Sequence, residues 1–350
     1  MKRSKQILLC LFVIWTCGCS SPSPATESVN AFMTKTPSIQ STTTMPTSQL
    51  QITYIQNDDN FGELYASDVN CMTQEPMCFS EPRLLFTTLT MPTSDQSWPR
   101  GLLTDYSWSA EGNRIALVSV GDILIGDLNK HNWTNITNSS DVDEYQPAWS
   151  HDGNAIYYRA CPRTADGIYG GHSACGIYSS DLTGNVKFTF LGSQSDYYDS
   201  YDVSPDGQKI VFALADTQGY DQIYQANLDG SENHQITAGQ INNSSPSFSP
   251  DGKKMIYVRI NEPNGANSPL QSDLILKDLE TGEEKILTKQ FDGDVFTPVF
   301  APDGNWVAFT SFDTSLNANI FVLSIDDGIW IQVTYTNHAV SPSWRLSVKP

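Results

Sequence analysis

Short segments rich in Asp and Asn recur at six places along this chain, at 57–60, 141–145, 196–201, 242–244, 292–296 and 337–338, and aromatic residues accompany the acids in three of them, 141–145, 196–201 and 292–296. Carboxylates beside aromatic rings suit a cationic peptide segment, a sugar that stacks on a ring, or a calcium ion. Acidic, Asn-rich segments are also typical of solvated turns that bind nothing. The candidate ligand-binding residues are Asp58, Asp59, Asp143, Glu144, Tyr145, Asp199, Tyr201, Asp294, Phe296 and His338.

Evidence for catalysis is thin in this sequence. The five histidines fall singly, and no His-Glu-x-x-His motif, Gly-rich phosphate loop or Cys/His zinc spacing is present. We therefore predict no catalytic residue and no cofactor, and leave open whether calcium binds. Glycoside hydrolysis needs two carboxyl groups at a set separation, which a ring of acids could supply. The favoured function is a non-enzymatic binding or scaffold protein, and the alternative is a carbohydrate-active hydrolase or lyase that uses these carboxylates.

Cysteine usage indicates an oxidising compartment. Cys10 and Cys17 fall in a basic and apolar leader, and Cys19 follows it in a context similar to a bacterial lipoprotein signal. Four cysteines remain, and their separations favour the disulfides Cys71–Cys78 and Cys161–Cys175. A metal site is the rival interpretation, but only His172 lies near either pair.

The elements that position the candidate residues come from an internal repeat. Successive anchor residues are separated by 41, 54, 45, 52 and 44 positions. The anchors are Trp108, Trp149, Val203, Phe248, Phe300 and Trp344. A tight turn, in most copies close to Ser-Pro-Asp-Gly, follows each of the first five anchors, and then come an alternating apolar run, a run ending in Asp or Asn, and a short run closing with Leu/Ile-Thr. Four short strands per repeat are typical of one propeller blade.

The blade count follows from the length of the repeat region. Residues 50–346 hold six periods, but the N-terminal piece lacks a first strand and the C-terminal piece supplies only a first strand. We therefore predict an all-β, six-bladed β-propeller closed by the C-terminal strand pairing into the first blade, an arrangement that leaves no open sheet edge. In such a ring the candidate residues would gather at the channel mouth, on the face opposite the Pro-Asp-Gly turns.

These repeats resemble those of the TolB-like, WD-repeat-like propeller family, in which Pro-x-Trp-Ser-Pro-Asp-Gly is followed by Ile-Tyr-x-x-Asp and Leu-Thr. The resemblance covers residues 50–346 and implies a six-bladed propeller. TolB itself carries an α/β domain before its propeller, and we expect no counterpart here, because only Ser- and Thr-rich sequence stands in that place.

The two ends and the overall charge predict location and partners. Residues 1–18 are predicted to be a signal peptide, 19–49 a Ser/Thr/Pro-rich tether and 347–350 a tail. We expect lipid on Cys19 to anchor the exported chain at the outer face of a bacterial membrane; simple secretion is the alternative. The net charge of −19 disfavours nucleic acid. The expected partner is an extracytoplasmic protein, peptide or glycan, bound by a monomeric propeller.

Overall fold

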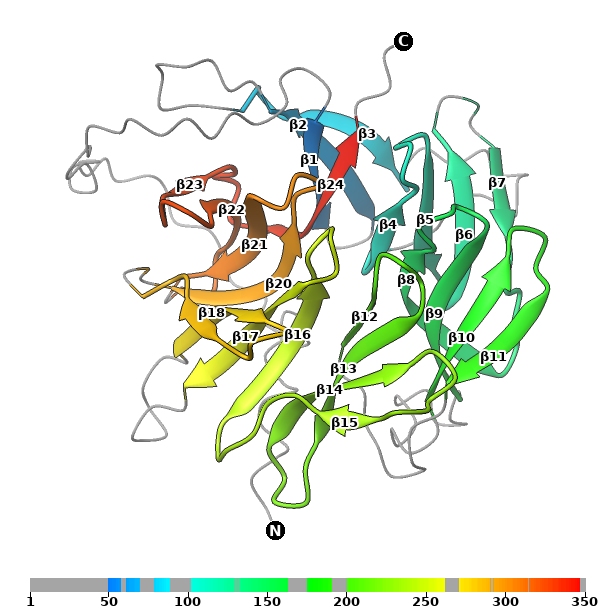
Figure 1. The fold of residues 1–350 in the computed structure, drawn as a ribbon. Helices are drawn as coiled ribbons and strands as arrows, with labels where there is room; N and C mark the ends of the chain where they lie inside the picture. Colours follow the sequence, from blue (N-terminus) through cyan, green and yellow to red (C-terminus); the bar gives the residue numbers. More distant parts are fainter. Residues whose placement is uncertain are drawn as a thin grey trace. The chain divides into compact units, whose positions relative to one another are not determined.

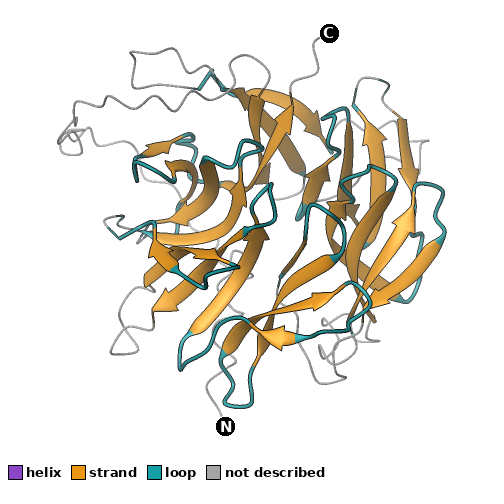
Figure 2. Cartoon of the chain, in the orientation of Figure 1, coloured by secondary structure: helices purple, strands orange, loops and turns teal. Residues whose placement is uncertain are grey.

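The computed structural model describes residues 50–57, 61–69, 79–88, 102–128, 130, 132–162, 175–190, 200–261, 271–289, 291, 293–313 and 315–346. All regular structure in these segments is β-strand (Figure 2). A helix able to cross a membrane does not occur within them. The predicted signal peptide, tether and tail lie outside the described residues, as do Cys19, Cys71 and Cys78, and those assignments stay predictions.

Six four-stranded antiparallel sheets form the blades of a propeller (Figure 1), which confirms the predicted fold. Blade 1 contains β24 (Ala339–Leu346), β1 (Leu50–Asn57), β2 (Gly62–Asp68) and β3 (Arg83–Thr87). Blade 2 contains β4 (Tyr106–Trp108), β5 (Arg114–Ser119), β6 (Asp122–Asp127) and β7 (Asn132–Asn135). Blade 3 contains β8 (Val142–Trp149), β9 (Ala155–Pro162), β10 (Gly176–Asp181) and β11 (Val186–Phe190).

The other three blades repeat this order from the inner strand outward. Blade 4 contains β12 (Tyr201–Val203), β13 (Lys209–Ala215), β14 (Asp221–Asn227) and β15 (His234–Gln235). Blade 5 contains β16 (Asn242–Phe248), β17 (Lys254–Asn261), β18 (Gln271–Asp278) and β19 (Glu284–Ile286). Blade 6 contains β20 (Asp294–Phe300), β21 (Trp306–Phe312), β22 (Ala318–Ser324) and β23 (Trp330–Gln332).

The last strand of the chain closes the ring. Strand β24 pairs antiparallel with β1, with Leu346 opposite Leu50 and Trp344 opposite Ile52. The core lies between the faces of neighbouring sheets, as where Ile52 and Trp344 of blade 1 share a cluster with Val322 of blade 6. Because the first blade is built from both ends of the propeller sequence, every blade has four strands.

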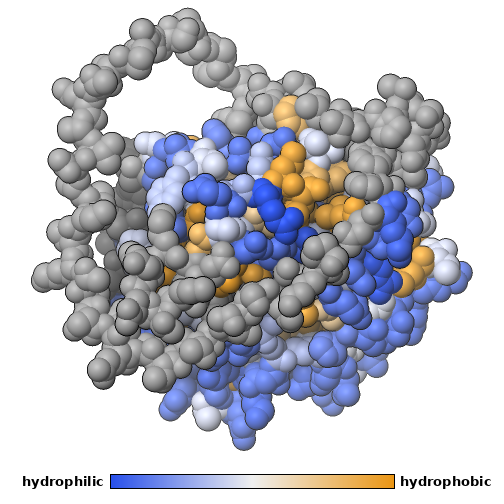
Figure 3. Space-filling model, turned by 90° about the horizontal axis from the view of Figure 1, so that it is seen from above, coloured by the Kyte–Doolittle hydropathy of each residue, from blue (hydrophilic) through white to orange (hydrophobic). Residues whose placement is uncertain are grey.

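The anchor residues join neighbouring blades. The indole Nε1 of Trp149 donates to the carbonyl of Ser107 in blade 2 at 3.1 Å, and that of Trp344 donates to the carbonyl of Val299 in blade 6 at 3.2 Å. Burial of each large anchor contributes about 2–3 kcal/mol. Hydrophilic residues, in contrast, make up much of the described surface seen from above, with hydrophobic residues visible in several patches among them (Figure 3).

The Ser-Pro-Asp-Gly turns fold as their sequence predicts. In blade 4, Asp206 Oδ1 accepts hydrogen bonds from Ser204 Oγ at 2.6 Å and from the amide of Gln208 at 3.0 Å. Gly207 has a φ of 69°, a region that glycine enters without steric cost. These hydrogen bonds lower the pKa of Asp206. The turn aspartates are therefore structural, and they lie at the ends of the inner strands opposite to the candidate residues.

Candidate binding site at the mouth face

We call the side of the ring on which the inner strands begin the mouth face. Four of the blades present a polar side chain six residues before the anchor, at the start of the inner strand. These residues are Asp143, Asn242, Asp294 and His338. The structure thus brings Asp143, Asp294 and His338 to equivalent positions in three blades. Asp58, Asp59 and Asp199 lie outside the described residues.

Several candidate residues belong to strands and not to loops, which differs from the expected loop character of these segments. Strand β8 already includes Asp143, Glu144 and Tyr145, and β20 includes Asp294 and Phe296. Alternation along a strand sends neighbouring side chains to opposite faces. Adjacent candidates therefore have different surroundings.

Glu144 illustrates this difference. Its side chain is only 2% exposed. Its Oε1 accepts from Ser139 Oγ at 2.7 Å and its Oε2 from Thr137 Oγ1 at 3.3 Å, while its amide donates to the carbonyl of Gly121 at 2.8 Å. Gly121 belongs to blade 2, and Thr137 and Ser139 lie on the connection from blade 2 to β8, so Glu144 links blade 3 to this connection and its carboxylate is not displayed at the mouth.

The threonine near the end of a repeat also makes hydrogen bonds where the chain passes from one blade to the next, a role that the sequence did not reveal. Thr237 Oγ1 accepts from the amide of Ile223 at 2.8 Å and donates to Gln222 Oε1 at 2.9 Å. Equivalent acceptor contacts are made by Thr88, Thr137, Thr288 and Thr334. The hydroxyl satisfies a third-strand amide at the point where the chain crosses to the next blade.

Asp294 is the most distinctive carboxylate of the mouth face. It is half-buried, and its Oδ1 is buried without a hydrogen-bond partner among the described residues. Burial raises its pKa to about 6. Two residues away, the ring of Phe296 packs edge-on against that of Phe312 with centroids 5.4 Å apart. A partly desolvated carboxylate beside an aromatic pair would be stabilised by a bound cation.

Three neighbouring blades meet around Arg159 on β9. Its guanidinium lies over the ring of Tyr145, 5.2 Å from the centroid. Tyr201 Oη of blade 4 donates to the carbonyl of Gln146 of blade 3 at 2.7 Å. Burial raises the pKa of Asp105 in blade 2, while Arg159 opposes that shift. Burial likewise raises the pKa of Tyr201 well above its usual value. Tyr145 and Tyr201 are thus candidates that the fold brings together, whereas Asp105 was not predicted.

Asp202 is a second acid that sequence reasoning missed. Its Oδ2 accepts from the amide of Phe248 in blade 5 at 2.8 Å, and its Oδ1 from the amide of Val203 at 2.9 Å. Burial raises its pKa to about 6 although both hydrogen bonds lower it. Its position directly before the anchor Val203 places it in the wall between blades 4 and 5.

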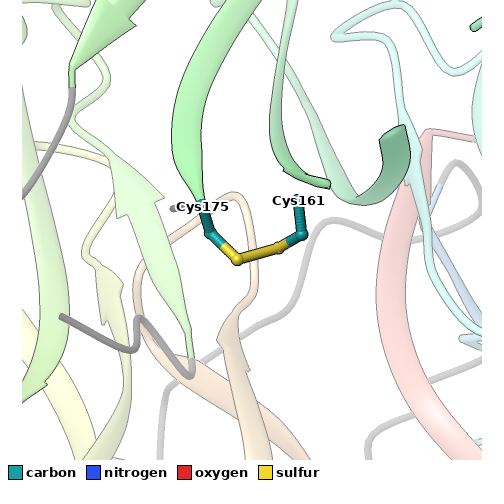
Figure 4. Close-up of a disulfide and its surroundings, with 2 residues drawn as sticks. All are labelled: Cys161 and Cys175. Atoms are coloured by element: carbon teal, nitrogen blue, oxygen red, sulfur yellow. A yellow bond between two sulfur atoms is a disulfide. The ribbon is translucent and has the colours of Figure 1, made fainter. Parts of the chain in front are cut away.

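The predicted disulfide Cys161–Cys175 is present, with Cα atoms 4.2 Å apart (Figure 4). Cys161 lies opposite Asp143 in the β8–β9 register, so the bridge lies beside the mouth face. His338, which is exposed, precedes β24 and forms a parallel bridge with Ala318. Within the described segments no group of three or more His, Cys, Asp or Glu side chains is placed to hold a metal ion.

Comparison by sequence gives partial relatives, and no family model matches the chain. Dipeptidyl-peptidase 5 of Porphyromonas gingivalis is 30% identical over 143 residues, which are 39% of this chain and 20% of that protein. An uncharacterized protein of Agrobacterium fabrum is 28% identical over 178 residues, 50% of this chain and 57% of its own length. The chain therefore spans between a fifth and somewhat over half of these relatives.

Comparison of structures shows the fold. TolB from Acinetobacter baumannii is similar with a TM-score of 0.61 and 21% identity, over 84% of this chain and 66% of that one. A structure of oligogalacturonate lyase in complex with manganese has a TM-score of 0.53 and 15% identity, over 79% of this chain and 73% of that one. The chain thus has the six-bladed β-propeller fold of TolB, as the repeats predicted.

Proposed function

We propose that this chain is an exported, lipid-anchored binding propeller without catalytic activity of its own, and that its mouth face holds a cationic segment of an extracytoplasmic peptide or protein. The observation that carries the proposal is Asp294, whose buried Oδ1 has no hydrogen-bond partner among the described residues. Asp143 occupies the equivalent position in blade 3. A lysine or arginine side chain bound beside this partly desolvated carboxylate would stabilise its charged form.

Charge and covalent chemistry support the same proposal. The chain has a net charge of −19, which favours encounter with cationic partners. The disulfide Cys161–Cys175 supports an extracytoplasmic location, because disulfides persist mainly in oxidising compartments. Lipid on Cys19 is part of the proposal and rests on the signal-like sequence alone.

Binding of a labelled octalysine peptide, with octaglutamate as the comparison, tests the proposal. The double variant Asp143→Asn/Asp294→Asn should bind octalysine at least about three-fold more weakly than the parent protein. The matched control is Glu280→Gln/Glu283→Gln, which removes the same charge from an exposed turn of blade 5. An equal loss of octalysine affinity in the two double variants would mean that only net charge matters, and it would refute the proposal. Unchanged octalysine binding in Asp143→Asn/Asp294→Asn would refute it as well.

A carbohydrate-active function at the mouth is the second candidate. Burial raises the pKa of Asp294 to about 6, and an acid in this range is suited to donate a proton near neutral pH. The fold is also that of oligogalacturonate lyase. This candidate predicts that Asp294→Asn abolishes turnover of an oligosaccharide while leaving its binding largely intact. Failure to detect any product from oligosaccharides of either neutral or acidic sugars would remove it.

A further inference from the structure

The connection between blades 5 and 6, which leads into β20, forms a pocket whose lining does not include the candidate residues of the mouth face. After β19 the chain turns, with the amide of Phe291 donating to the carbonyl of Thr288 at 2.8 Å. This turn lays Phe291 against blade 6, where its ring contacts those of Phe309, Phe321 and Trp330. A cavity of about 270 Å³ lies between this segment and the β22–β23 turn, and Trp330 is part of its wall.

Trp330 is held in place but remains accessible. Its ring centroid is 5.2 Å from that of Phe291 and 5.9 Å from that of Phe321, at steep interplanar angles of 88° and 66°. The residue is nevertheless 45% exposed. It lies on the outermost strand of blade 6, where solvent-exposed positions usually carry polar side chains. A large aromatic ring fixed by its neighbours and open to solvent is typical of a binding surface.

The charged groups that line the pocket are one acid and one base. Asp327 and Lys289 both line the cavity, and both are exposed. Among the described residues the carboxylate of Asp327 accepts one hydrogen bond, from Ser324 Oγ to Oδ2 at 3.3 Å. The carboxylate can therefore accept further hydrogen bonds, and the lysine can donate them. A ligand whose groups both donate and accept hydrogen bonds therefore matches this pair.

We propose that this pocket binds the ring of a neutral pyranose sugar, with its C–H face against Trp330 and its hydroxyls toward Asp327 and Lys289. The cavity is slightly smaller than the roughly 300–1,000 Å³ of pockets for drug-sized ligands, which suits a single ring. Hydroxyl groups match both the acceptor and the donor, and the apolar side of the sugar matches the indole. This site goes beyond the proposed function at the mouth and does not depend on it.

Saturation-transfer NMR and titration calorimetry on the whole exported protein test this site. The probes are methyl glucoside, methyl galactoside and methyl N-acetylglucosaminide, with methyl glucuronide as the charged comparison. A single ring should bind with a dissociation constant on the order of 1 mM. Trp330→Ala should weaken binding of the neutral glycoside about ten-fold or more, and Asp327→Asn should weaken it less.

Two matched variants separate a binding role from a structural one. Tyr335→Ala removes another exposed aromatic residue that does not line the pocket, and its affinity should equal that of the parent. Trp330→Phe keeps an aromatic face and should restore part of the affinity lost in Trp330→Ala. The proposal is overturned if none of the three neutral glycosides binds, if only the glucuronide binds, or if Trp330→Ala binds like the parent. Because neither Asp143 nor Asp294 lines this pocket, their variants should bind the sugar normally.

Discussion

Replacing Arg345 by methionine should weaken closure of the ring. Arg345 follows Trp344 on the closing strand and is only 7% exposed. Its Nε donates to the carbonyl of Gly112 in blade 2 at 2.8 Å, and its guanidinium carbon lies 4.2 Å from the centroid of the Trp108 ring. Burial, with Arg83 as a neighbouring positive charge, lowers its pKa to about 10. The side chain thus joins the last strand to the turn of the second blade.

The magnitude follows from these two contacts. A hydrogen bond from a charged donor contributes about 1.5–3 kcal/mol. A partly desolvated cation over an indole contributes about 1–2 kcal/mol. Relief of the cost of burying the charge offsets part of this sum. We expect Arg345→Met to lower the free energy of unfolding by about 2–3 kcal/mol, measured by urea denaturation with tryptophan fluorescence.

Arg114 provides a matched control, because it makes the same pair of contacts one blade further on. Its Nη2 donates to the carbonyl of Gly153 at 3.2 Å, and its guanidinium carbon lies 4.6 Å from the centroid of the Trp149 ring. Arg114 is half-buried and joins blades that are already linked by the chain. Arg114→Met should therefore lower the free energy of unfolding by less than Arg345→Met does. An unchanged or higher stability of Arg345→Met would refute the role assigned to Arg345.

Three further predictions concern pH, the disulfides and the anchor. Asp202 has a folded pKa of about 6 against its ordinary 3.8, so the folded state binds the proton more tightly, and its stability should rise as the pH falls from about 6 to about 4. Asp294 contributes over the same range, so Asp202→Asn should reduce the slope of this part of the pH profile without abolishing it, and an unchanged slope would refute the contribution of Asp202. Non-reducing peptide mapping should recover Cys161–Cys175 and Cys71–Cys78 without cross-pairs. Cys161→Ser removes the Cys161–Cys175 bridge and should lower the free energy of unfolding by about 3 kcal/mol. Free thiols in the parent protein would contradict the pairing. Labelling with a fatty-acid analogue should be lost in Cys19→Ala but kept in Cys17→Ala, and an unlabelled parent would indicate simple secretion.

The fold could be predicted because its signals are local and repeated. Each Ser-Pro-Asp-Gly turn is stabilised within a few residues, as by the bond between Ser204 and Asp206. Six copies with similar spacing then define the ring, and the incomplete first and last copies indicate closure of β24 on β1. None of these inferences needs a contact between distant residues to be known in advance.

The site was harder to predict because its contacts join distant residues. Arg345 and its acceptor Gly112 are 233 positions apart, and no local pattern marks either residue. Glu144 resembles its neighbour Asp143 in sequence, but it accepts hydrogen bonds from Thr137 and Ser139 on the connection that leads into its strand. Burial separated the acids into structural and accessible groups, and burial depends on how two blades pack.

Proton release on peptide binding tests the central claim most directly. Asp294 has a pKa of about 6, so near that pH about half of the molecules carry a proton on this carboxyl. If a cationic segment binds there, it must displace that proton. Calorimetry of octalysine binding near pH 6, in buffers with different ionisation enthalpies, should show proton release that disappears in Asp294→Asn. Binding without proton release, or release that persists in the variant, would contradict the assignment of the acidic mouth as the binding site.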